Sequence, residues 1–206
     1  MPSAVDLCNQ ALSQIRADSI SDLGEGSLEA DACRAVYDET RRFVLRDSPW
    51  PFATETVALA QVGTDHPDGW AYVYDYPNAC LRLLKVGPRG SFRQVSGNEG
   101  DNPLLAHKLV SVAGRRAILS DIDKAFAQII VDQVDPSRFD PQFTHALVWY
   151  IAAQIAVPVV GVDRGRALRN DALSMYRAVV DAARSTMQNE STPAPQKESD
   201  FVSVRY

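Results

Sequence analysis

Hydrophobic residues recur about every three to four positions in the first 15 residues of the chain, and again between residues 28 and 46. This spacing places them on one face of an α-helix. Ser3, with Asp6 three residues later, precedes the first segment, and Ser27 precedes the second, as expected of helix N-caps. We therefore expect two helices with the apolar faces Val5, Cys8, Leu12 and Ile15, and Leu28, Ala32, Ala35, Val36 and Phe43.

The second predicted helix also carries charged residues close to its apolar face. Glu39 lies within that face and Arg42 and Arg46 lie within its reach, which predicts a partly buried ion pair. Arg41, Arg42 and Arg46 stand in the C-terminal part of the helix, where cations complement the negative end of the helix dipole. This interpretation of the arginines is favoured over a contact with DNA.

The sequence Pro49–Trp50–Pro51–Phe52 follows this helix. Each proline restricts φ, lacks an amide hydrogen and favours extended geometry in the residue before it. Trp50 and Phe52 should therefore stand on a stiff segment, and we interpret them as an anchor between the helices and the next part of the chain.

Residues 54–133 show the alternation and turn sequences of short β-strands. The predicted strands are 55–62, 70–77, 80–86, 91–95, 107–112, 116–120 and 125–131. This segment is expected to form a small module of antiparallel hairpins.

Helical periodicity returns at Asp140–Pro141, a typical N-cap and first-turn pair. The chain is then apolar nearly all round from Phe143 to Val157, which predicts a buried central helix. Pro158 and Gly161 should end it.

A last helix is predicted from Asp163 to Met187. Its apolar stripe, about half of the circumference, could pack on two neighbours at once. The stripe contains Leu168, Ala172, Met175, Val179 and Ala182, widened by Leu173, Tyr176, Val180 and Met187.

Residues 191–206 are polar and contain prolines, which predicts a flexible tether. The tether ends in FVSVRY, and we interpret Phe201 and Tyr206 of this hexapeptide as a docking tip. The alternative is a terminus that is merely disordered.

Together these patterns predict an α+β fold with a helical bundle formed by residues 1–53 and 134–190. An antiparallel β-rich module, 54–133, is inserted into the bundle, and an extended C-terminal tail, 191–206, follows it.

Composition narrows the possible functions. Hydrophobic residues at 46% and charged residues at 23% are ordinary for a globular protein, and no apolar run approaches the roughly 18 residues of a membrane span. A net charge of −5 disfavours a dedicated nucleic-acid binder. The three cysteines are an odd number without a CxxC pair, so we expect reduced thiols.

Reactive groups in a spacing typical of catalysis are scarce. His66, beside Asp65 and Asp68, is more typical of a hairpin turn than of a metal site. The acid pairs Asp121/Asp123 and Asp132/Asp135 are interpreted as solvated loop residues, because glycoside hydrolysis needs two carboxylates across a cleft. We therefore predict no catalytic residue, cofactor or metal site.

Three segments carry a resemblance to a known family. YDETRRFVLRDSPWPFAT resembles the start of the tail tubular protein A family of short-tailed bacteriophages, also described as head-to-tail adaptor or connector proteins. YDYPNACLRLLKV is similar to a second family segment, with Asn-Ala where Ala-Asp is more usual, and VDPSRFDPQF resembles a third; residues 87–110 match only loosely. The family positions in the first segment are held by Tyr37, Asp38, Arg41, Arg42, Pro49, Trp50, Phe52 and Ala53. The chain's end, SDFVSVRY, is similar to a short terminal motif of the family.

The resemblance implies a non-enzymatic virion protein at the head–tail junction, assembled in the host cytoplasm. Its partners would be copies of itself in a ring, expected to be twelve-fold, the portal protein and the tail nozzle or tail tube protein. Genomic DNA would pass through the lumen without specific binding, and no membrane is involved. The candidate structural and interface residues are Arg41, Arg42, Pro49, Trp50, Phe52, Phe139, Phe143, Leu168, Met175, Val179, Phe201 and Tyr206.

Two other functions remain open at this point. A virion-associated glycan hydrolase with a secondary structural role would need an acid pair in a cleft. A helical regulator or packaging factor that binds DNA would show steeply salt-dependent binding.

Overall fold

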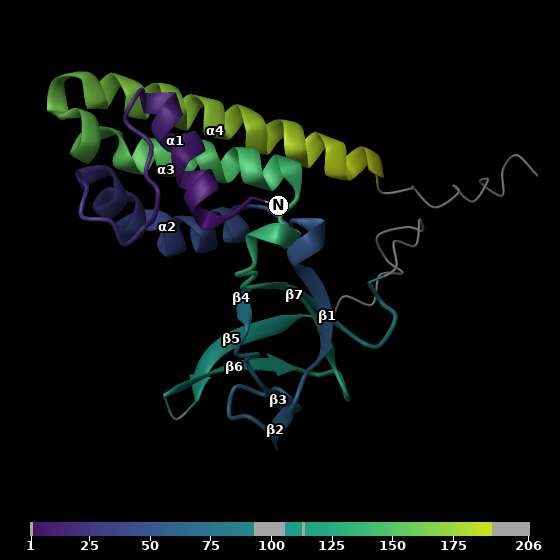
Figure 1. Cartoon of the computed structure of the whole chain (residues 1–206). Helices are drawn as coiled ribbons and strands as arrows, with labels where there is room; N and C mark the ends of the chain where they lie inside the picture. Colours follow the sequence, from purple (N-terminus) through teal and green to yellow (C-terminus); the bar gives the residue numbers. More distant parts are fainter. Residues whose placement is uncertain (1, 93–105, 113, 191–206) are drawn as a thin grey trace, which may run out of the picture. The chain divides into compact units, whose positions relative to one another are not determined.

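The computed structural model describes residues 2–92, 106–112 and 114–190 (Figure 1). Within these residues the chain forms four α-helices and two antiparallel sheets, which makes it an α+β protein. It divides into two compact units. The bundle unit combines the chain up to Thr54 with Val131–Asn189, and the β unit comprises Glu55–Ile130.

Helix α1, Ala4–Ile15, begins with a capping box. The Asp6 amide donates to Ser3 Oγ over 3.1 Å, and the Ser3 amide donates to the Asp6 carboxylate over 2.8 Å. These bonds satisfy amides that a helix start leaves unpaired and confirm the predicted N-cap. The buried face contains Leu7, Cys8, Ala11, Leu12 and Ile15.

The loop after α1 is held by side-chain acceptors. Asn9 exchanges two hydrogen bonds with the backbone of Ile20, of 2.9 and 2.8 Å. The Glu25 carboxylate accepts from the Ser21 hydroxyl at 2.6 Å, the Ser27 hydroxyl at 2.7 Å and the Ser21 amide at 2.9 Å. These bonds lower the pKa of Glu25 to about 2.

Helix α2, Leu28–Asp47, starts after the predicted cap Ser27, but its predicted apolar face is wrong. Leu28 and Phe43 are 57% and 47% exposed. A pattern of hydrophobic residues alone misses the buried face of α2, because this face includes polar residues whose aliphatic or aromatic parts pack inward. The buried residues are Ala30, Cys33, Tyr37, Thr40, Arg41, Val44 and Leu45.

Helix α3, Pro141–Val160, packs against both α1 and α2 and is the core helix of the bundle unit. It passes through Pro158, so the predicted end there is wrong: a proline in the last turn forfeits one hydrogen bond without stopping the helix. The chain leaves the helix at Gly161, where φ is +89°.

The composition of α3 also corrects the expectation about apolar runs. Among the described helices, α3 is long and apolar enough to cross a membrane. Half of that span is buried inside the bundle unit, and the core helix of a folded domain has the same composition. The helix is therefore explained by its packing.

Helix α4, Val162–Glu190, turns back tightly after α3. A Cβ on Gly165 would lie 2.7 Å from the Ala156 carbonyl oxygen, so only glycine allows this approach. The buried positions on α4 include Ala172, Tyr176, Val180 and Ala183, whereas the predicted stripe residue Met175 is 43% exposed. The predicted stripe thus contains the buried Ala172, Tyr176 and Val180, but it wrongly includes the exposed Met175 and Ala182 and misses Ala183.

The β unit contains two sheets (Figure 1). The first has the order β1-β7-β4, formed by Thr54–Ala58, Phe126–Val131 and Cys80–Gly87. The second has the order β2-β3-β6-β5, formed by Gln61–Thr64, Tyr72–Asp75, Arg115–Ser120 and His107–Val112.

Two strand predictions need correction or remain open. The predicted strand 55–62 is in fact parts of two strands in different sheets, because the chain crosses over at Leu59 and Ala60. In the predicted strand 91–95, residues 91–92 form a turn, and the others lie outside the described residues.

Strand β6 lies between β3 and β5 in the four-stranded sheet, and its residues Ala117–Ser120 are buried on both faces. Tyr74 on β3 opposes Ile118, and Val73 opposes Leu119. Val73 and Leu119 belong to a hydrophobic cluster on one face. On the other, the Tyr74 hydroxyl donates to the Ile122 carbonyl over 2.5 Å.

All three cysteines are buried, and none of them forms a disulfide. A hydrogen bond with Cys33 and burial raise the pKa of Cys8, so this thiol stays protonated at neutral pH.

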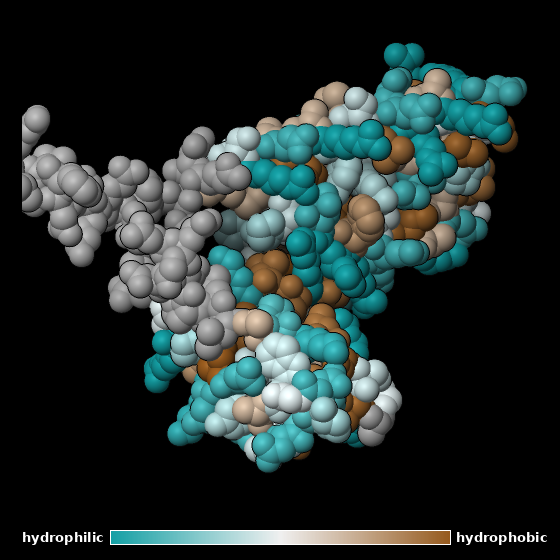
Figure 2. All heavy atoms as spheres, turned by 180° about the vertical axis from the view of Figure 1, so that it is seen from behind, coloured by the Kyte–Doolittle hydropathy of each residue, from teal (hydrophilic) through white to brown (hydrophobic). Residues whose placement is uncertain are grey.

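Large apolar side chains that remain exposed occur in both units. Figure 2 shows one face of the molecule, on which hydrophobic atoms form separate patches among polar ones. Scattered exposure of this kind is normal for a protein surface. The exposed large residues are Leu28, Phe43, Val62, Leu109, Val112, Val134, Val162 and Met175.

Candidate functional site

Two of the segments that carry the family resemblance meet in an aromatic cluster of the bundle unit. The ring of Phe143 lies 5.3 Å from Trp50, 5.1 Å from Phe52 and 4.8 Å from Phe139, in edge-on geometries. Trp50 is 1% exposed, and its indole N–H donates to the Val44 carbonyl over 2.8 Å. Burial of the apolar rings with the polar N–H satisfied makes this cluster a rigid anchor.

The two prolines around Trp50 shape this anchor. Pro51 begins a short 3₁₀ turn, Pro51–Ala53, and the Thr54 hydroxyl donates to the Trp50 carbonyl over 2.7 Å. Pro49 is exposed, so its contribution is to the backbone. Ser48, before Pro49, has an extended backbone, and Trp50, before Pro51, has ψ of 124°, so the predicted effect of the prolines is confirmed; the chain turns only after Trp50.

A buried arginine ties α2 to the chain that follows β7. Arg41 is 1% exposed; it forms an ion pair with Asp132, and donates to the Gln133 carbonyl over 2.7 Å. Arg42, more than half exposed, donates to the other oxygen of Asp132 over 3.0 Å. The predicted buried ion pair centred on Glu39 is therefore wrong, because Glu39 is exposed and the buried charge is Arg41.

The acidic residues considered for catalysis accept hydrogen bonds from backbone amides or form ion pairs with arginines. Asp121 accepts from the Ala71 amide over 2.9 Å, and Asp135 accepts from the Ser137 amide over 2.9 Å, which lowers the pKa of Asp135. Asp132 is 22% exposed and paired, so the expectation of a solvated acid is wrong for it. In the described part of the chain no group of three or more His, Cys, Asp or Glu side chains could hold a metal ion.

The predicted interface residues on α4 lie at the edge of its buried face. Leu168 and Val179 are half-buried and Met175 is exposed. The neighbouring Tyr176 donates to the Asp47 carboxylate over 2.7 Å, and burial and this bond raise the tyrosine pKa. Phe201 and Tyr206 lie outside the described residues.

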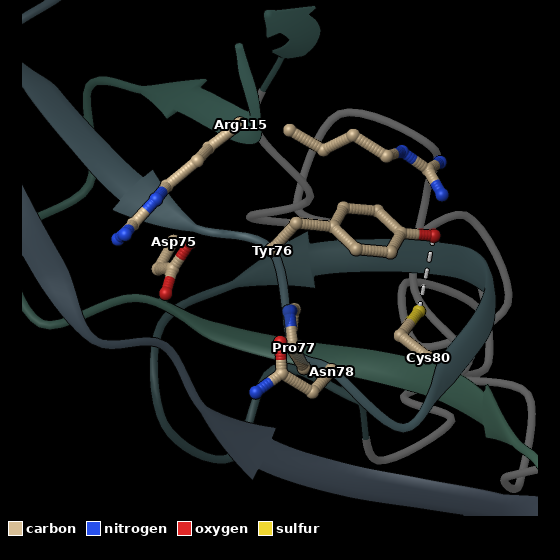
Figure 3. A pocket seen from close by; sticks show the side chains of 7 residues that line it. Asp75, Tyr76, Pro77, Asn78, Cys80 and Arg115 are labelled. Carbon is tan, nitrogen blue, oxygen red and sulfur yellow. Dashed lines mark hydrogen bonds between the residues drawn. The ribbon is translucent and has the colours of Figure 1, made fainter. Parts of the chain in front are cut away.

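A pocket opens in the β unit beside another segment of the resemblance (Figure 3). Its volume is about 560 Å³, within the range of ligand sites. Figure 3 shows Asp75 and Arg115 near each other at one side, with Tyr76 and Cys80 joined by a hydrogen bond at the other. The lining consists of Asp75, Tyr76, Pro77, Asn78 and Cys80 from the chain between β3 and β4, with Arg115 and Arg116 from β6.

The fixed element of this pocket is Tyr76. Its ring is buried, and the Arg116 guanidinium carbon lies 3.8 Å from the ring centroid. The Cys80 thiol donates to the Tyr76 hydroxyl over 3.2 Å, and the Tyr76 amide donates to the Arg116 carbonyl over 3.3 Å. Burial raises the pKa of Tyr76, so the phenol is neutral beneath the Arg116 guanidinium.

Sequence reasoning missed the residues that these sites depend on most. Asp132 was dismissed as a loop acid, although its position just after the last strand could have suggested a partner. No local pattern marks Arg115 or Arg116: the predicted strand begins at Arg116, and Arg115 follows Gly114, where φ is +79°. The contact of Arg116 with Tyr76 joins residues 40 positions apart, which a local pattern cannot reveal.

No protein-family model and no curated protein matches this chain. The family resemblance therefore stands on the motif residues alone.

Proposed function

We propose that this chain is a structural protein of a phage virion, an adaptor in the ring that connects the portal to the tail nozzle or tail tube. In this role its copies extend the channel through which DNA leaves the capsid. The proposal assigns the chain no catalytic role.

The observation that supports this proposal best is the position of the motif residues. Trp50, Phe52, Phe139 and Phe143 come from distant segments and form one packed cluster, and Arg41 is buried against Asp132. Residues used in this way maintain the shape of the bundle unit. Such use is expected of a protein whose function is mechanical.

The test is the mass of portal assemblies. The portal protein from the same genome is mixed with the chain, and native mass spectrometry gives the number of bound copies. We expect about one copy per portal subunit, and a portal that gains no mass would overturn the proposal.

A pair of variants on α4 makes this test specific. Met175→Asp places a charge on the exposed edge of the apolar stripe and should reduce the bound copies. Asn170→Asp introduces the same charge at another exposed position of the helix and should leave the bound copies unchanged. Equal binding of both variants would exclude this edge of α4 from the interface.

A further inference from the structure

The pocket in the β unit contains charged groups that the adaptor proposal does not use. Arg115 and Arg116 supply two cations and Asp75 one carboxylate, on a chain whose net charge is −5. Arg116 is oriented by the Tyr76 ring, which lowers the entropy lost when a ligand binds. A basic pocket on an acidic chain favours an acidic ligand.

The mixed charge of the lining favours polypeptide over nucleic acid. A run of phosphates would meet the two arginines but also the Asp75 carboxylate, which repels it. A peptide can present a carboxylate to the arginines and a cation to the aspartate. The Asn78 amide can both donate to and accept from a peptide backbone.

One segment of this chain has the required charges. Residues 196–206, QKESDFVSVRY, begin with the charged residues Lys197, Glu198 and Asp200, and an apolar stretch follows. Lys197, Glu198 and Asp200 lie within four consecutive positions, so the segment presents one cation and two carboxylates close together, as the pocket requires. This segment begins six positions after Glu190, where the last described helix ends.

We propose that this pocket binds residues 196–206 of a second copy of the chain, with Glu198 and Asp200 against Arg115 and Arg116, and the adjacent Lys197 against Asp75. The assignment to a second copy rests on the proposed ring, in which copies are neighbours and a tethered contact gains effective concentration. The pocket thereby becomes a polar link between subunits.

A peptide titration tests this proposal without any portal. A fluorescently labelled synthetic peptide of residues 196–206 is titrated with the full chain at low ionic strength, and its anisotropy is followed. We expect saturable binding that weakens with added salt. Arg116→Ala should weaken it about tenfold or more, and so should a peptide carrying Glu198→Gln and Asp200→Asn.

The controls separate recognition from folding. Arg138→Ala removes an exposed arginine of the bundle unit and should leave the affinity unchanged. Circular dichroism melting of Arg116→Ala should match the wild type. If this variant melts early, Tyr76→Phe takes its place. This variant keeps the ring under Arg116 but removes the hydroxyl. A pocket that binds the peptide through its arginines should then keep its affinity within about twofold of the wild type.

Three results would overturn the proposal. The first is absence of saturable binding up to about 1 mM chain. The second is equal affinity for the wild type and Arg116→Ala. The third is peptide binding that appears only after residues 191–206 are deleted, which would mean that each chain fills its own pocket. A portal that gains no mass, with peptide binding intact, would instead overturn the adaptor function alone.

Discussion

The bundle unit and the β unit use arginine in opposite ways. In the bundle unit Arg41 is 1% exposed and its charge is matched by Asp132 inside the structure. In the β unit Arg115 and Arg116 are exposed and line an open pocket, where the Arg116 guanidinium lies over the ring of Tyr76. A buried arginine with its own partners maintains the fold, whereas an exposed and oriented arginine is available to a ligand.

The largest expected effect tests the anchor of the bundle unit. Trp50→Ala removes a buried indole from between Phe143 and α2 and leaves the Val44 carbonyl without its donor. We expect a loss of about 3–5 kcal/mol in the free energy of unfolding, measured by urea denaturation. Trp149→Ala, at a half-buried position of α3, is the control and should cost clearly less. Similar losses would mean that Trp50 is no anchor.

The different roles of the buried and the exposed arginines can be tested with one substitution in each unit. Asp132→Ala leaves Arg41 buried without its main counterion and should lower the free energy of unfolding by about 3 kcal/mol. Arg116→Ala loses one cation–π contact at the surface and should cost less than about 1 kcal/mol. Denaturant midpoints measure both, and a smaller loss for Asp132→Ala than for Arg116→Ala would reverse the comparison.

A third prediction concerns the backbone of the bundle unit. Gly165→Ala places a Cβ 2.7 Å from the Ala156 carbonyl oxygen and 2.8 Å from the Val157 Cα, both backbone atoms that cannot move aside easily. The substitution should push α3 and α4 apart and lower the free energy of unfolding by about 1–3 kcal/mol. Gly26→Ala is the matched control, because nothing lies within 4 Å of its Cβ. Thermal melting of both variants decides whether the close approach is required.

The smallest effect lies at the surface and depends on pH. The pKa of Glu25 falls from 4.5 to about 2 on folding, so its stabilising contribution is present above pH 4.5 and is lost as the pH falls toward 2. Glu25→Gln should therefore melt slightly below the wild type at neutral pH, and the two melting temperatures should converge between about pH 4.5 and pH 2. A difference that persists at pH 2 would mean that the charge of Glu25 is not its cause.

Prediction from sequence worked where the determining interactions are local. Ser3, Ser27 and Asp140 cap helices as predicted, because a cap needs only its own first turn. The apolar face of α2 was misread because Arg41 is buried through a partner in a distant part of the chain. The pocket was missed for the same reason, since two separate segments supply its two sides.

The pairing of β1 with β7 has a consequence for how this chain folds. The β unit interrupts the bundle unit in sequence, so residues on either side of Glu55–Ile130 must come together before α2 can pack on α3. The length-dependent part of the entropy cost of closing a flexible loop of that length is about 4 kcal/mol. Because β1 and β7 are neighbours in one sheet, formation of that sheet brings the two ends of the insertion side by side. The β unit should therefore form no later than the bundle, and pulse-labelled hydrogen exchange should protect the amides of β7 before those at the α2–α3 contact.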